Sequence, residues 1–178
     1  MIEASLTDSG EQLIWSGNPS PGRYALRKGS YAFLFGIFFF GLSLFWIRGA
    51  SMAERGAAAN FWMLVFAGAF LMLFPVLHFF RGLRTIYALT DRRAIIDVSG
   101  PFPGRMSVPL NQIPFVEVQS SAEGPGHVLF QELPFVASSY SGYAKQRDGF
   151  IAIADAAQVG HLLRSAIEKT VSARLGRS

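Results

Sequence analysis

The sequence predicts a two-helix transmembrane hairpin, an antiparallel β-sheet or barrel, and one amphipathic helix at the C-terminus. Three observations predict this combination. Residues 30–80 contain two long apolar runs, and residues from about 84 to 153 contain short alternating runs rich in β-branched and aromatic side chains. From residue 159 onward, apolar side chains recur at helical spacing.

The hairpin is predicted from the length of its apolar runs. No Asp, Glu, Lys or Arg occurs between Lys28 and Arg48, or between Arg55 and Arg81. Crossing a bilayer core of roughly 30 Å takes about 20 apolar residues in a helix, and both runs reach that length. Two buried helices of a soluble core would each need a polar face, which neither run offers. We therefore expect an integral membrane protein with helices at about 30–47 and 61–80.

The flanking charges predict the orientation of the hairpin. Lys and Arg collect on the cytoplasmic side of membrane helices. Cations are more numerous at the two outer flanks than in the connecting loop, which places both termini in the cytoplasm. Trp46 and Trp62 stand at the loop ends of the two helices, as interfacial anchors do. The outer cations are Arg23, Arg27, Lys28, Arg81, Arg84, Arg92 and Arg93.

Within the second helix, Pro75 removes one backbone hydrogen bond and is expected to bend the last turns. His78 lies in the final turn, where an imidazole is expected at the interface, although ionisable groups in membrane segments can be functional. Several small residues in the two helices offer surfaces for helix contact, although none of them forms a clean GxxxG pair. They are Gly36, Gly41, Ser43, Ala67, Gly68 and Ala69.

The composition excludes several function classes. The chain has a formal charge of +4, but its basic residues cluster beside the helices, so nucleic-acid binding is not predicted. It has no cysteine, which excludes disulfides, thiolate nucleophiles and cysteine metal sites. His78, His127 and His161 are scattered, and no phosphate-binding or nucleophile motif occurs. We expect a non-enzymatic protein with no cofactor, no metal and no evident small-molecule substrate.

The segment before the hairpin, residues 1–29, is expected to be a separate cytoplasmic N-terminal segment. Residues 11–15 fit a short extended or helical piece, and the run NPSPG at 18–22 is expected to interrupt regular structure. Trp15 fits two places, packed on the soluble domain or resting at the lipid interface.

Residues 81–178 are expected to form a cytoplasmic domain. The runs RTIYALT, RRAIIDV, RMSVPL, PFVEVQS, HVLFQEL and GFIAIA read as strands, separated by turn-forming segments. Asp155 is a good N-cap for the closing helix, with Gln158 three residues on. The apolar face of that helix is expected to pack on the sheet, and consists of Val159, Leu162, Leu163, Ala166, Ile167 and Val171.

A resemblance to a family strengthens this reading. The run YALTDRRAII, directly after the hairpin, resembles the Y-x-L-T-x-R-R signature of bacterial membrane proteins with a pleckstrin-homology (PH)-like domain. The run GEQLIWSGNP at residues 10–19 is similar to the opening of those proteins, and GFIAIADAAQVGHLL is similar to the closing segment of one branch. The signature residues here are Tyr87, Leu89, Thr90, Arg92 and Arg93.

The resemblance implies a PH-like fold and a multi-pass protein of the bacterial inner membrane, and no catalytic role carries over from it. Thr90 suits a tight turn, and Arg92 and Arg93 have two readings: solvated side chains, or contacts with lipid head groups. The candidate lipid-contacting residues are Arg81, Arg84, Arg92 and Arg93. Two functions are open: a membrane-anchored module that binds a protein partner or anionic lipid, and an accessory or assembly subunit of a larger membrane complex.

Overall fold

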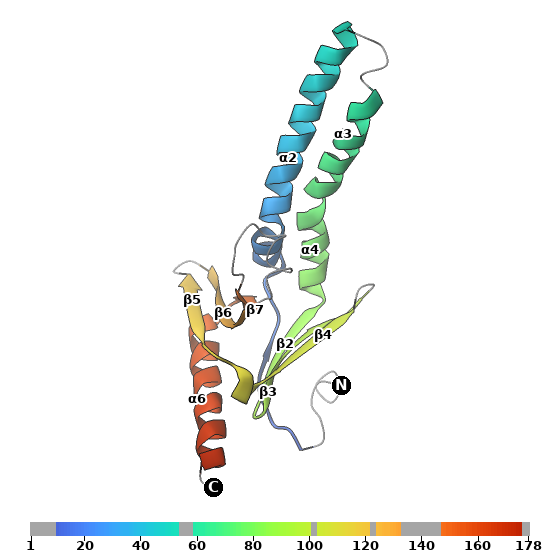
Figure 1. The fold of residues 1–178 in the computed structure, drawn as a ribbon. Helices are drawn as coiled ribbons and strands as arrows, with labels where there is room; N and C mark the ends of the chain where they lie inside the picture. Colours follow the sequence, from blue (N-terminus) through green and yellow to red (C-terminus); the bar gives the residue numbers. More distant parts are fainter. Residues whose placement is uncertain (1–9, 54–58, 101–102, 122–123, 133–146, 176–178) are drawn as a thin grey trace. The chain divides into compact units, whose positions relative to one another are not determined.

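The computed structural model describes residues 10–53, 59–100, 103–121, 124–132 and 147–175 (Figure 1). The chain divides into two compact units. We call residues 1–24 and 80–178 the β unit, and residues 25–79 the helical unit. The β unit is therefore discontinuous in sequence, because the helical unit is inserted into it.

Three helices account for the two apolar runs. They are α2 (Pro21–Ala53), α3 (Ala59–Met72) and α4 (Phe74–Leu83). Two stretches, Pro21–Gly49 and Trp62–Leu83, are long and apolar enough to cross a membrane, judged by length and composition. Large apolar side chains such as Phe45 and Met63 are more than 70% exposed. The prediction of two long apolar helices is confirmed.

The first helix begins nine residues earlier than expected, because Pro21 starts α2 instead of breaking it. The carbonyl of Ser20 accepts a hydrogen bond of 2.9 Å from the backbone N–H of Tyr24, which makes Ser20 the residue before the first turn. Proline is well suited to the first helical position, since its missing N–H has no partner there and its φ is already helical. The expected interruption therefore ends at Ser20.

Pro75 separates α3 from α4, as its missing N–H predicts. Leu73 lies between the two helices, and its N–H donates to the carbonyl of Phe70, only three residues back, at 3.0 Å. Pro75 has no N–H to donate to the carbonyl of Leu71, so the regular ladder is interrupted there.

Small residues let the helices of the helical unit approach closely. Gly29, Gly36 and Ser43 of α2 are all buried and follow one another at seven-residue spacing. A methyl group at Gly36 would lie 2.8 Å from the carbonyl oxygen of Gly68, and one at Gly68 would lie 2.7 Å from the backbone nitrogen of Phe40. Backbone contact of this kind is typical of membrane helix pairs. Among the expected small surfaces, Gly36, Ser43 and Gly68 are used inside the hairpin, whereas Gly41 has open space around it.

The strands form two antiparallel sheets (Figure 1). One sheet has the order β1–β2–β3–β4 and the other has the order β5–β6–β7. The prediction of an antiparallel sheet is confirmed, but no strand pairing closes the two sheets into a barrel within the described residues. The bounds are β1 Leu13–Gly17, β2 Thr85–Thr90, β3 Arg93–Val98, β4 Gly104–Pro109, β5 Glu117–Ser121, β6 Gly124–Glu132 and β7 Arg147–Ile153, with a 3-10 turn η1 at Leu110–Gln112.

Strand β1 revises the expected boundaries of the domain. It pairs antiparallel with β2, with Trp15 opposite Leu89 and Gly17 opposite Tyr87. The segment 1–29 is therefore not separate from the domain at 81–178, since part of it is an edge strand of the same sheet. The local pattern at residues 13–17 indicates a strand. It does not indicate the partner strand β2, which follows the whole hairpin in the sequence.

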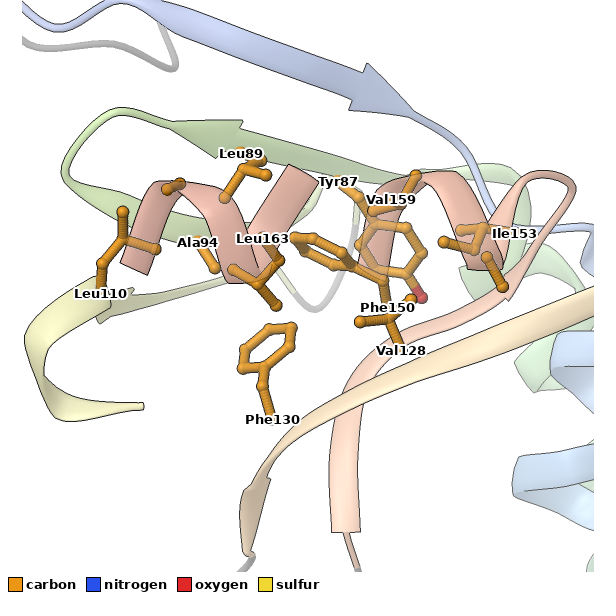
Figure 2. Close-up of a cluster of buried hydrophobic side chains, with 12 residues drawn as sticks. Tyr87, Leu89, Ala94, Leu110, Val128, Phe130, Phe150, Ile153, Val159 and Leu163 are labelled. Atoms are coloured by element: carbon orange, nitrogen blue, oxygen red, sulfur yellow. The ribbon is translucent and has the colours of Figure 1, made fainter. Parts of the chain in front are cut away.

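Helix α6 (Ala156–Leu175) covers the core of the β unit, as predicted. Figure 2 shows Leu163 of α6 among the aromatic side chains of Phe130 and Phe150 from the second sheet. Val159 and Leu163 are fully buried, whereas Val171 is 47% exposed. The expected apolar face therefore packs along the first turns, and its last member lies outside the core.

Candidate functional site

The two segments that carry the family resemblance meet in the β unit. Nη2 and Nε of Arg93 donate hydrogen bonds of 2.9 and 3.2 Å to Oε2 of Glu11. The side chain of Glu11 is 4% exposed and that of Arg93 is 21% exposed. Arg93 therefore makes an ion pair with Glu11, a contact that neither reading made from sequence included.

Backbone contacts join the same two segments. The N–H of Gln12 donates to Oδ1 of Asp91 at 3.0 Å, and the N–H of Asp91 donates to the carbonyl of Gln12 at 3.1 Å. We call Glu11, Gln12, Asp91 and Arg93 the β1 anchor. The anchor holds the chain just before β1 against the turn between β2 and β3.

Thr90 shapes that turn, as expected. Its Oγ1 accepts hydrogen bonds from the backbone N–H groups of Arg92 and Arg93, at 3.2 and 3.0 Å. The same hydroxyl lies 3.0 Å from the carbonyl of Arg93 and donates to it. The hydroxyl of the buried Thr90 thus satisfies three backbone groups of the turn between β2 and β3, where the two strands no longer pair. The role of Thr90 is structural.

Tyr87 and Leu89, the other signature residues, lie in the core. The hydroxyl of Tyr87 is 3.3 Å from both the carbonyl oxygen and the backbone nitrogen of Ile151 on β7. Burial raises the pKa of Tyr87 above its ordinary value, because the phenolate would lose its hydration. The ring of Trp15 lies 5.4 Å from that of Phe150, so Trp15 packs on the β unit.

The arginines expected to meet lipid do not form one patch. Arg81 and Arg84 precede β2, whereas Arg92 follows it, and all three side chains are exposed. Six strand residues separate the two ends by about 17 Å at the usual rise per residue. Arg84 lies against Gly100, where an added methyl group would come within 2.7 Å of Nη1. Arg81 and Arg84 are therefore the two that are near each other along the chain, at the junction of α4 and β2.

The two tryptophans expected to be anchors lie on the helices. Trp46 of α2 is 51% exposed and Trp62 of α3 is 50% exposed. Each contacts a neighbouring phenylalanine of its own helix, Phe45 at 6.3 Å and Phe66 at 6.5 Å between ring centroids. Exposed indoles near helix ends fit the amphipathic position of interfacial anchors.

No cluster of His, Cys, Asp and Glu suited to a metal ion occurs within the described ranges. Sequence reasoning missed two sets of residues in this region. One property of Glu11 was visible in the sequence: its charge is opposite to that of Arg92 and Arg93 in the second segment. The residues that line a cavity beside β6, among them Val108, Phe115 and Gln131, carried no local signal. Comparisons with family models, curated proteins and solved structures gave no match to this chain.

Proposed function

We propose that the chain is a membrane-anchored, non-catalytic interaction module. A PH-like domain, carried by a transmembrane hairpin, binds a protein partner or anionic lipid at the cytoplasmic face of the inner membrane. The observation that carries the proposal is the insertion of two exposed apolar helices between the adjacent strands β1 and β2. This connection ties the β unit to the bilayer at two points of its own sheet.

The order of elements supports the PH-like assignment. Four antiparallel strands, then three, then one C-terminal helix is the arrangement expected of that fold. In this chain the connection from β1 to β2 is the hairpin itself. The two segments that carry the resemblance contain Trp15 and the residues of the β1 anchor. These residues hold β1 against the rest of its sheet on the far side of the hairpin.

The junction of α4 and β2 supports binding to anionic lipid. Arg81 and Arg84 lie at the end of the second apolar stretch, Trp62–Leu83, so the chain keeps them close to the bilayer surface. Near an anionic leaflet each cation gains about 1 kcal/mol, an attraction that salt screens. Arg92 lies at the far end of β2 and serves as the matched control.

Native mass analysis of the full chain, extracted in a mild detergent, tests this proposal. We expect anionic lipids to remain bound to the wild type and to the Arg92→Gln variant. The double variant Arg81→Gln/Arg84→Gln should lose them. Equal lipid retention in all three proteins would refute the lipid reading and leave protein binding as the function of the domain.

The same measurement addresses the second function, an accessory subunit of a larger complex. A stoichiometric complex that co-purifies through the hairpin would favour it. The small residues Gly36, Ser43 and Gly68 no longer argue for it, because they pack inside the hairpin. Reporter fusions after residue 178 and within residues 51–59 test the orientation. A periplasmic signal from the C-terminal fusion would reverse the proposed topology.

A further inference from the structure

The end of β7 contains an extra residue that β6 does not match. Gly126 of β6 is opposite Ile153 and His127 is opposite Ile151, so Ala152 has no partner on β6. An extra residue of this kind is a β-bulge. Ala152 has a φ of 58°, and it is the one non-glycine residue with a positive φ in the described part of the chain. Such a conformation persists because the surrounding structure holds it.

Two other parts of the β unit supply the hydrogen bonds that β6 does not. The N–H of Ala152 donates to Nδ1 of His127 at 2.9 Å. The carbonyl of Ala152 accepts a hydrogen bond of 2.7 Å from the N–H of Ser20, the residue before the first turn of α2. Ala152 is fully buried, so water does not replace either partner. One buried residue therefore joins an imidazole on β6 to the start of the first apolar helix.

Side-chain packing at the same place supports this connection. Tyr24, in the first turn of α2, packs with Ile151 and Ala152 in a small apolar cluster. A methyl group added to Gly82 of α4 would lie 3.2 Å from both Cδ1 of Tyr24 and Cα of Pro21. The last turn of α4 is therefore in contact with the first turn of α2, and the first turn of α2 is in contact with the bulge.

His127 makes its bond to the bulge in only one protonation state. A neutral imidazole has one ring nitrogen that accepts, and the bond from Ala152 identifies Nδ1 as that acceptor. A protonated imidazole is a donor at both nitrogens, so the N–H of Ala152 loses its partner. Histidine ordinarily changes its charge between about pH 5 and 8, and the half-buried His127 is open to protons from water. The bond is therefore present at the upper end of this range and is lost as the pH falls.

Charges of both signs lie on the elements around His127. Arg23 lies against Gly124, since an added methyl group there would come within 2.7 Å of its Nη2, and this cation opposes protonation of the imidazole. The carboxylate of Asp148 favours protonation, and that of Glu117 is paired with Arg147. Helix α6 packs on the other face of the sheet, against Val128. The titratable groups on these neighbouring elements are Arg23 and Tyr24 of α2, Arg81 of α4, Glu117 of β5 and Asp148 of β7.

We propose that Ser20, His127 and Ala152 form a pH-sensitive switch between β7 and the first turn of α2. At neutral pH the imidazole holds the bulge, and the bulge holds Ser20. On acidification His127 takes up a proton from water, and the N–H of Ala152 loses its acceptor. The bulge is then no longer fixed, and the first turn of α2 is released from β7. This inference goes beyond the proposed function, because the switch needs neither a bound lipid nor a bound partner.

Hydrogen–deuterium exchange of the full chain in nanodiscs of zwitterionic lipid tests this proposal. Mass spectrometry follows the peptides that contain Ser20 and Ala152 at about pH 8 and about pH 5, with correction for the intrinsic effect of pH on exchange. We expect both peptides of the wild type to lose protection about tenfold at the lower pH, the usual loss for a buried donor without its acceptor. The segment of α6 around Leu163 should keep its protection. An equal loss there would overturn the switch, because the whole β unit would then be opening.

Two variants of His127 separate the hydrogen bond from the charge. His127→Asn has a carbonyl oxygen that accepts at either pH, and it should keep protection at both. His127→Leu has no acceptor and should show low protection at both. His161→Gln, which changes an exposed histidine of α6, is the matched control and should behave like the wild type.

Two results would overturn the proposal. One is undiminished protection of the wild type at the lower pH. The other is a loss of protection at the lower pH in His127→Asn as large as that of the wild type. The Asn variant decides the question by itself if the Leu variant folds poorly.

Discussion

Replacement of Arg93 by glutamine tests whether the β1 anchor holds the β unit together. The change removes the guanidinium that is 2.9 Å from the Glu11 carboxylate, a side chain that is 4% exposed. At 2.9 Å and an effective dielectric constant of about 20, the two charges attract by about 6 kcal/mol before desolvation is subtracted. Breaking one side of a buried pair typically costs about 3–5 kcal/mol. Since Arg93 is 21% exposed, we expect about 3 kcal/mol, a large part of a typical domain stability of 5–15 kcal/mol.

A double-mutant cycle separates the pair from other effects of the substitutions. Glu11→Gln should cost less than Arg93→Gln, because Arg93 keeps partial access to water. In the double variant two amides replace two charges, and no uncompensated charge remains buried. We expect the double variant to be more stable than Arg93→Gln alone, with a coupling of about 2–3 kcal/mol.

Trp15 provides the assay, since its ring packs on Phe150. Urea unfolding of the full chain in mild detergent, in a Trp46→Phe/Trp62→Phe background, follows Trp15 fluorescence alone. Arg92→Gln, one residue away and exposed, is the control and should cost less than about 0.5 kcal/mol. Equal costs for the Arg92 and Arg93 variants, or simple additivity in the cycle, would refute the role assigned to the pair.

Three further predictions follow from the packing. Gly68→Leu should weaken the hairpin and lower its aggregation temperature in detergent by several degrees, because an added Cβ lies 2.7 Å from backbone; Gly41→Leu, with open space, should not. Leu163→Asp should unfold the β unit, since a buried unpaired charge costs several kcal/mol, and an unchanged urea midpoint would contradict its burial. Raising the pH above about 10 should destabilise the wild type by about 1.4 kcal/mol per pH unit, because only the unfolded state releases the Tyr87 proton; urea midpoints from pH 9 to 11 should show a flatter slope in Tyr87→Phe.

Local patterns in the sequence predicted the elements of the fold well. Short runs rich in β-branched and aromatic residues marked β6 and β7, and the capping residue Asp155 marked the start of α6. Pro21 was misread because proline and glycine between 18 and 22 resemble a loop, whereas Ser20 before proline is also a helix start. The local sequence at this position therefore fits both a loop and a helix start, and it does not decide between them.

Partners that are distant in sequence were not predictable. Glu11 and Arg93 are separated by 82 positions, and no periodicity links them. The cavity beside β6 is lined by residues of both sheets, among them Val108 and Gln131, and no local pattern links them. The candidate cavity could therefore be found only after both sheets were placed.

The insertion of the hairpin between β1 and β2 also fixes an order of events during synthesis. Asn18 and Thr85, which are joined by a hydrogen bond, are 67 residues apart. At about 5–20 residues per second, the ribosome needs roughly 3–13 s to make the second partner after the first. Throughout that interval β1 has no strand of its own sheet to pair with, while the residues of the apolar helices are being made. Completion of the β unit therefore has to wait for synthesis of the whole hairpin, and β1 has no partner strand in its sheet until β2 has been made.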